Sequence, residues 1–219
     1  ISDNLCLGDS KHRPFADFYK NISAQLNQWC TSHQYTLTMN QVILHNIVMR
    51  EIPQEKFLQM HPDLVEKDRL CHEGIHDKKD ELLRQNTFDF TSTFQENPKL
   101  LESAQNQLQQ AFDAPLPLDK LQYFGDALNT LVFVLTFEGH KEVGADQWLP
   151  MTILLLVLAE PKRLPSTIAY IDHFVKNLAE QGSDIHLISE TTEYTFTMIK
   201  SALMHFQKSI PGIGDPQES

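Results

Sequence analysis

Apolar residues recur at intervals of three and four positions along most of the chain, which is the spacing of one face of an α-helix. The clearest stripe covers residues 118–135, and similar stripes cover residues 100–112, 168–178 and 194–206. Glycine is scarce, and β-branched residues do not alternate with polar ones over any long run. The pattern therefore predicts an all-α fold, arranged as a layered helical bundle.

The N-terminal part of the chain carries a weaker form of the same pattern. Helices are predicted at residues 15–29 and 42–48, and Pro53 is expected to end the second or begin another. Between Gln54 and Arg84, charges of both signs are mixed with few apolar residues, which is typical of solvated helix faces. We expect a helical region at residues 1–85, a main helical domain at 86–208 and a flexible tail at 209–219.

One segment, residues 142–158, stands out because a single carboxylate precedes a continuous apolar run. The turn Val143-Gly144-Ala145 leads to Asp146, and the run that follows is shorter than the ~20 residues of a membrane-spanning helix. We therefore expect a helix buried in a soluble core, with Asp146 at its beginning. The simplest interpretation of Asp146 is an N-cap that accepts hydrogen bonds from free backbone amides. Pro150 fits the first turn of such a helix or a kink deeper within it.

The overall charge narrows the classes of partner. The chain has 219 residues and a net charge of −11, which argues against nucleic acid and disfavours anionic lipid. Its three cysteines are an odd number without framework spacing, and no signal peptide precedes them, so we expect a reducing, cytoplasmic setting. The chain begins with Ile1 rather than methionine, and we expect it to be a fragment of a longer protein.

His72-Glu73-Gly74-Ile75-His76 matches the zinc-protease motif H-E-x-x-H. On a helix the two histidines would face one side and could bind zinc, with Glu73 as the general base. Charged residues follow the motif directly, Gly74 weakens a helix by about 1 kcal/mol, and the longer metalloprotease motif is absent. We therefore reject His72, Glu73 and His76 as a metal site, and a zinc hydrolase stays a remote alternative.

Other conventional chemistry has no sequence support. The chain lacks a dinucleotide-binding glycine motif, a phosphate-binding loop and a nucleophile elbow, and its cysteines lack zinc-ribbon spacing. We expect no cofactor and no metal. A helical chain with one placed carboxylate is typical of a protein that binds and remodels another protein.

Four short motifs follow one another in the C-terminal half of the chain. They are residues 117–121 (PLDKL), 144–150 (GADQWLP), 164–171 (LPSTIAYI) and 194–197 (YTFT). In this order they resemble the signatures of the vacuolar-protein-sorting-nine domain, the catalytic domain of guanine nucleotide exchange factors for Rab-five-type endosomal GTPases. The resemblance covers roughly residues 98–207. It departs from the family's pattern at Met151-Thr152-Ile153 and at Glu160-Pro161-Lys162, as a divergent member would.

The resemblance implies an all-α exchange domain at residues 86–208 with a groove for the switch regions of the GTPase. It makes Asp146 the acidic finger, Pro150 part of one wall, and Tyr194, Thr197 and Met198 contacts on the other wall. It also implies a cytoplasmic protein that is recruited to endosomal membranes without spanning them. Lys120, Trp148 and Leu149 are expected to be structural.

The mechanism follows from charge. A GTPase holds its nucleotide through a phosphate-binding lysine and a magnesium ion, so a carboxylate near that lysine competes with the phosphate. Because coupling between two ligands is reciprocal, such a factor should prefer the nucleotide-free GTPase. The main alternative is a noncatalytic helical module that binds a Rab or serves as a scaffold. Residues 1–85 could brace the exchange domain, cover it or bind separately.

Overall fold

The computed structural model of this chain describes residues 53–85, 97–137, 145–180 and 189–213, together with Ala24, Gln25 and Gln28. Those three residues are helical. The rest of the helix expected at 15–29 lies outside the described residues, as does the helix expected at 42–48. The chain divides into two compact units, residues 1–52 with 177–187 and residues 53–176 with 188–219. The contacts described below lie within the second unit.

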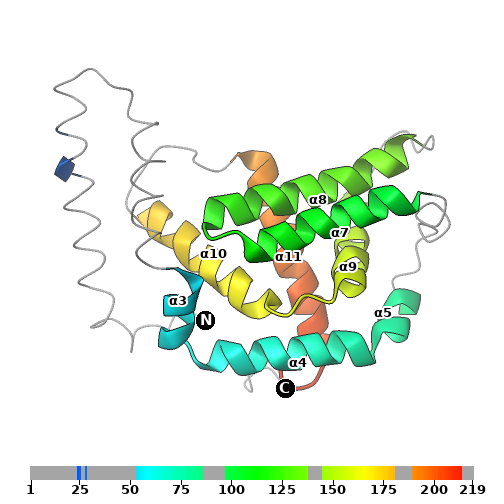
Figure 1. Ribbon diagram of the computed structural model, residues 1–219, viewed down its shortest axis with the longest axis horizontal. Helices are drawn as coiled ribbons and strands as arrows, with labels where there is room; N and C mark the ends of the chain where they lie inside the picture. Colours follow the sequence, from blue (N-terminus) through cyan, green and yellow to red (C-terminus); the bar gives the residue numbers. More distant parts are fainter. Residues whose placement is uncertain are drawn as a thin grey trace. The chain divides into compact units, whose positions relative to one another are not determined.

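Every regular element in the described parts of the chain is a helix, which confirms the predicted fold class (Figure 1). In chain order the helices are α3 (Gln54–Met60), α4 (Asp63–Asp77), α5 (Lys79–Gln85), α7 (Pro98–Asp113), α8 (Pro117–Phe137), α9 (Ala145–Ala159), α10 (Leu164–Glu180) and α11 (Glu190–Ser209).

Helices α7 and α8 lie side by side as a hairpin (Figure 1). The connection is short, because α7 ends at Asp113 and Pro117 is the first residue of α8, where a missing N–H costs little. The rings of Phe112 and Phe124 pack edge to face with centroids 5.4 Å apart. Lys120 is 1% exposed, and its ammonium donates to the carbonyls of Ala111 (3.3 Å) and Phe112 (2.8 Å). It therefore satisfies carbonyls at the end of α7, and burial lowers its pKa to about 8.

Helix α9 is the central element of this unit and contacts α5, α7, α8 and α11. Its side chains are apolar on nearly all sides, as expected for a helix covered by neighbours. Five of its apolar residues are almost fully buried: Met151, Ile153, Leu155, Leu156 and Val157. The expected buried helix is thus present. None of the helices in the described residues combines the length and apolar character needed to cross a bilayer.

Helix α4 packs against the C-terminal end of α11, at a position where a side chain larger than hydrogen would not fit. A Cβ atom on Gly74 would lie 2.2 Å from Cγ2 of Ile210. Gly74 therefore permits this close approach, which is a role that the helix-weakening interpretation did not foresee. Lys78 donates to the carbonyl of Ser209 at the end of α11. Ile210 and Ile213, in the segment expected to be a tail, are buried.

The region 54–84 was expected to present solvated faces, and this expectation is wrong for several of its polar residues. Gln54 and Asp68 are buried, with 5% and 6% of their surface exposed. Both contact the beginning of α10. The amide of Gln54 donates to the hydroxyls of Ser166 (3.3 Å) and Thr167 (3.0 Å), and Oδ1 of Asp68 accepts from the backbone N–H of Ser166 (2.9 Å).

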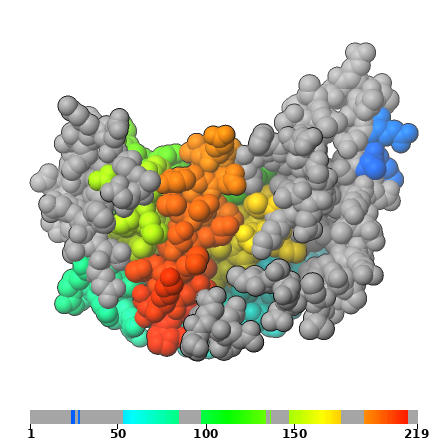
Figure 2. Space-filling view, turned by 180° about the vertical axis from the view of Figure 1, so that it is seen from behind, coloured from blue at the N-terminus to red at the C-terminus, as the bar shows by residue number. Residues whose placement is uncertain are grey.

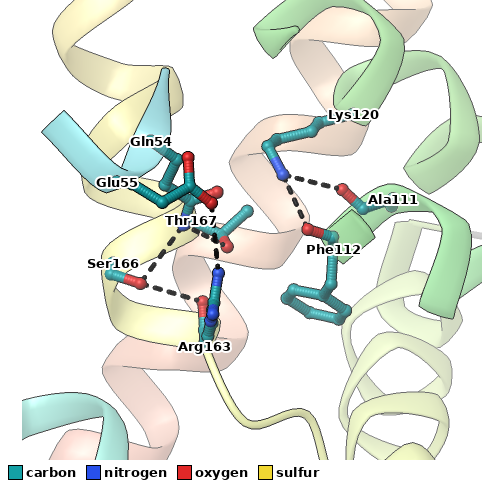
Figure 3. Close-up of polar contacts among 8 residues, drawn as sticks. All are labelled: Gln54, Glu55, Ala111, Phe112, Lys120, Arg163, Ser166 and Thr167. Carbon is teal, nitrogen blue, oxygen red and sulfur yellow. Dashed lines mark hydrogen bonds and ion pairs between the residues drawn. The ribbon is translucent and has the colours of Figure 1, made fainter. Parts of the chain in front are cut away.

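Figure 3 shows Gln54 and Glu55 of α3 beside the start of α10, where Arg163 lies 3.7 Å from Glu55. Ser166 and Thr167 are fully buried there. Burial raises the pKa of the Asp68 carboxyl, and its hydrogen bonds with Ser166 oppose this shift. The start of α10 is therefore capped by Asp68 of α4, and its hydroxyls accept hydrogen bonds from Gln54 of α3, about a hundred positions earlier in the chain.

Candidate functional site

The first turn of α9 contains the carboxylate that the sequence singled out. The helix begins at Ala145, so Asp146 is its second residue rather than its N-cap. Only the backbone of Asp146 is described. A carboxylate in the first turn of a helix is favoured by the positive end of the helix dipole whichever way it points.

Pro150 lies within α9, one turn after Asp146. Because proline has no N–H, it cannot donate the usual helical hydrogen bond to the carbonyl of Asp146. Two residues after Pro150, the hydroxyl of Thr152 donates to the carbonyl of Trp148 at 2.7 Å. Pro150 is half-buried in the helix interior, and it leaves the carbonyl of Asp146 without the N–H that position 150 would otherwise supply.

Helix α11 supplies the second set of expected site residues. Its N-cap is Ser189, whose hydroxyl accepts from the backbone N–H of Thr192 at 3.2 Å. The helix starts at Glu190. Tyr194 and Thr197 are consequently in the first two turns of a helix. Both are exposed, and Met198 is half-buried.

A contact between two aromatic rings joins α9 to α11. The rings of Trp148 and Tyr194 pack edge to face with centroids 5.5 Å apart. Trp148 lies two residues after Asp146, so this contact brings the start of α9 next to the start of α11. Sequence reasoning placed Trp148 in the core. It is half-buried, packs against the core and also contacts the ring of Tyr194, and no local pattern could show this contact because the two residues are 46 positions apart.

Tyr194 and Thr197 present polar atoms outward. Tyr194 is 36% exposed, and its hydroxyl forms no hydrogen bond within the described residues. The hydroxyl of Thr197 donates to the carbonyl of Glu193 at 2.9 Å, so its oxygen remains able to accept a hydrogen bond. Glu190 and Glu193 are exposed in the same first turn of α11. The site therefore offers carboxylates, a phenol and a hydroxyl oxygen, which suits a partner with cationic and N–H groups.

Lys200 does not neutralise these carboxylates. Its ammonium lies 3.4 Å from Asp172 of α10 and 4.7 Å from the centre of the Phe196 ring. A cation held in this way supports the packing of α11 against α10.

The residues of the rejected zinc motif lie on α4 and have other contacts. Glu73 binds Arg69, and Nδ1 of His76 lies 2.9 Å from Glu160 in the turn after α9. Lys79 also contacts Glu160, at 2.6 Å. These two cations lower the pKa of Glu160 to about 2, and Glu160 in turn raises the pKa of His76. In the described part of the chain, no group of three or more His, Cys, Asp or Glu side chains is placed to hold a metal.

A recess of about 420 Å³ opens between the end of α7 and the turn from α9 to α10. It is lined by Gln109, Phe112, Asp113, Ala159, Glu160, Lys162 and Arg163. None of the residues expected to contact a GTPase lines this recess, so it is separate from the candidate site.

Comparison with known proteins agrees with the family that the order of the four motifs indicates. The family model described as the vacuolar sorting protein 9 (VPS9) domain matches residues 101–210, which include α8, α9, α10 and α11. A comparison with curated proteins gave no match. The matched segment covers half of the chain and contains Asp146, Pro150, Tyr194 and Thr197. The chain therefore belongs to the VPS9 domain family, whose general role is guanine nucleotide exchange on Rab-type small GTPases.

Proposed function

We propose that this chain accelerates the release of GDP from Rab-five-type small GTPases at endosomal membranes. The observation that carries the proposal is the Trp148–Tyr194 contact, since it joins the two helices that bear the motif residues. A GTPase switch region that reached the exposed face of α11 at Tyr194 and Thr197 would also lie beside the first turn of α9. Asp146 belongs to that turn.

Asp146 acts in this proposal by electrostatic competition. Its carboxylate approaches the phosphate-binding lysine of the GTPase and takes over the charge that the phosphate had neutralised. It also repels the phosphates and disfavours the magnesium-bound arrangement of the nucleotide. Pro150 supports this role, because its missing N–H removes one helical hydrogen bond that would otherwise hold the first turn of α9. No covalent step is needed.

The other residues of the proposed site orient the GTPase. Tyr194 offers an aromatic ring and a hydroxyl, Thr197 offers an oxygen acceptor, and Pro150 and Met198 provide apolar surface. Aromatic residues with a polar tip are common in the energetically important parts of interfaces. The nucleotide-free GTPase is the preferred partner, because the carboxylate and the phosphate compete for one lysine.

A nucleotide-release assay tests the proposal. Rab GTPases of several types are loaded with a fluorescent GDP analogue, and release is followed in excess GTP with increasing amounts of the chain. We expect acceleration that depends on chain concentration and is largest for a Rab-five-type GTPase. Release at the intrinsic rate for every GTPase tested would overturn the proposal.

A further inference from the structure

The outward face of α11 continues well beyond the residues of the proposed site. Thr197, Ser201, Met204 and Lys208 follow Tyr194 at intervals of three, four, three and four residues, so they form one stripe along the helix. The opposite side of α11 is buried. Its buried residues are Thr195, Phe196, Ile199, Ala202, Leu203 and Phe206.

Met204 is an unusual member of this stripe. It is 56% exposed, and it lies between a hydroxyl residue, Ser201, and the cation Lys208. Tyr194 and Met204 are ten residues apart, which corresponds to about 15 Å along a helix. In Figure 2, α11 crosses the visible face from its orange beginning to its red end, with outward side chains in view along its length.

The size of a protein interface makes this extension informative. A specific interface buries about 800 Å² on each partner and involves about 20–30 residues a side. Tyr194, Thr197, Met198 and Pro150 together cannot supply that area, so the GTPase must contact neighbouring surface as well. The stripe along α11 is continuous with the proposed site, and methionine is enriched in interfaces because its flexible side chain adapts to a partner.

We propose that Met204 is a further contact residue for the GTPase and helps to determine which GTPase is bound. This inference rests on the proposed function. The partner on this stripe is the same GTPase that contacts Tyr194. That GTPase presents an apolar patch to Met204. Its cationic groups face Glu190 and Glu193, because these two carboxylates flank the other end of the stripe. The charge pattern of α11, acidic at its start and basic at Lys208, fixes the direction in which the partner lies along the helix.

The chain offers a matched control in Met60. It is the last residue of α3, it is 46% exposed, and it lies outside the stripe. Substituting either methionine with lysine adds the same charge at an exposed position. Met204→Leu keeps an apolar side chain of similar volume and reports on shape alone.

Two measurements test the inference. In the first, the chain carries methionine labelled with ¹³C in the methyl group, and Met204→Leu and Met60→Leu identify the two resonances. Adding a nucleotide-free Rab GTPase is expected to shift or broaden the Met204 signal and to leave the Met60 signal unchanged. In the second, Met204→Lys is expected to raise the dissociation constant for that GTPase about tenfold, while Met60→Lys and Met204→Leu change it less than about twofold.

The outcomes separate this inference from the proposed function. If Tyr194→Ala weakens GTPase binding but Met204→Lys does not, the inference about Met204 is wrong and the proposed function stands. If Met204→Lys weakens binding but the wild-type chain releases no nucleotide, Met204 is a binding residue and the proposed exchange activity is refuted. If no Rab GTPase binds, or if the Met204 signal shifts with the concentration of the chain alone, the GTPase contact is refuted.

Discussion

The beginnings of α10 and α11 both carry hydroxyl side chains, and they differ in what those hydroxyls contact. At the start of α10, Ser166 and Thr167 are fully buried and accept hydrogen bonds from Gln54. At the start of α11, Tyr194 and Thr197 face outward, and the Tyr194 hydroxyl has no partner in the described residues. Similar residue types are therefore buried where α3 and α4 cover them, and they stay exposed where none of the described helices covers them.

The same contrast applies to the carboxylates of the two regions. Asp68 is buried and caps α10 from another helix, so its removal should affect folding. Asp146 lies in the first turn of α9, in a segment that contacts the start of α11 through Trp148. Asp68 therefore serves the stability of the unit and Asp146 the proposed action on a partner, and substitutions at the two positions should have different effects.

The largest effect is expected for Asp146→Ala. We predict that GDP release falls to the intrinsic rate of the GTPase, because the competing carboxylate is lost. The free energy of unfolding should fall by about 1 kcal/mol or less, the value of a favourable charge in a first helical turn. Asp119, an exposed carboxylate in the first turn of α8, is a matched control. Equal loss of release with Asp119→Ala, in a stopped-flow assay, would contradict a specific role for Asp146.

The next largest effect is expected for Asp68→Ala, and it concerns stability rather than nucleotide release. Removing the carboxylate leaves the buried N–H of Ser166 without an acceptor, so the free energy of unfolding should fall by about 2 kcal/mol. Asp68→Asn should cost less than about 1 kcal/mol, because an amide oxygen can still accept that hydrogen bond. Urea denaturation measures both. Nucleotide release per folded molecule is expected to match the wild type, and a selective loss of release would contradict a purely structural role for Asp68.

Tyr194→Ala should weaken GTPase binding about tenfold, since it removes an aromatic contact and a hydroxyl from the proposed interface. Loss of the ring contact with Trp148 should also cost about 1 kcal/mol of stability. Tyr194→Phe keeps the ring and isolates the hydroxyl. Titration of the nucleotide-free GTPase provides the measurement, and undiminished affinity in the alanine variant would exclude this face of α11 as the binding surface.

The smallest effect is expected at Glu160, which joins the α9–α10 turn to His76 and Lys79. Its pKa is lowered to about 2 from an ordinary 4.5, so its contribution to stability is present above pH 4.5 and is lost as the pH falls toward 2. The raised pKa of His76 acts in the other direction. That contribution is complete below pH 6.5 and is lost as the pH rises through the raised pKa.

The two contacts of Glu160 therefore stabilise the turn together between about pH 4.5 and 6.5. Glu160→Gln should lower stability by about 1 kcal/mol or less in that window and leave exchange unchanged. Thermal unfolding followed from about pH 2 to about pH 9 tests the expectation, because the difference should shrink on both sides of the window. A stability difference that does not change with pH would show that the two ion pairs are not its source.

Much of this fold could be predicted from local sequence. The stripe at residues 118–135 corresponds to α8, and the apolar run after Asp146 corresponds to the buried helix α9. These predictions succeed because helical periodicity reflects which face of a segment is buried. The order of the four short motifs also identified the family that the family model matches.

The remaining features depend on contacts between distant segments, which local patterns do not contain. Asp68 lies in a charged run that is typical of an exposed face, but its partner Ser166 is 98 positions later. Gly74 weakens a helix in isolation, and its role depends on the close approach of Ile210. The roles of Asp146, Pro150, Tyr194, Thr197 and Met198 in exchange stay predictions.

The central claim is that the chain binds a small GTPase in competition with its nucleotide. Calorimetric titration of the chain into one Rab-five-type GTPase, prepared nucleotide-free, GDP-loaded and GTP-loaded, tests this claim most directly. We expect the tightest binding to the nucleotide-free form, with affinity for the GDP-loaded form reduced by the same factor by which the chain weakens GDP binding. Tighter binding to the GTP-loaded form than to the nucleotide-free form would contradict it and identify a noncatalytic Rab-binding module.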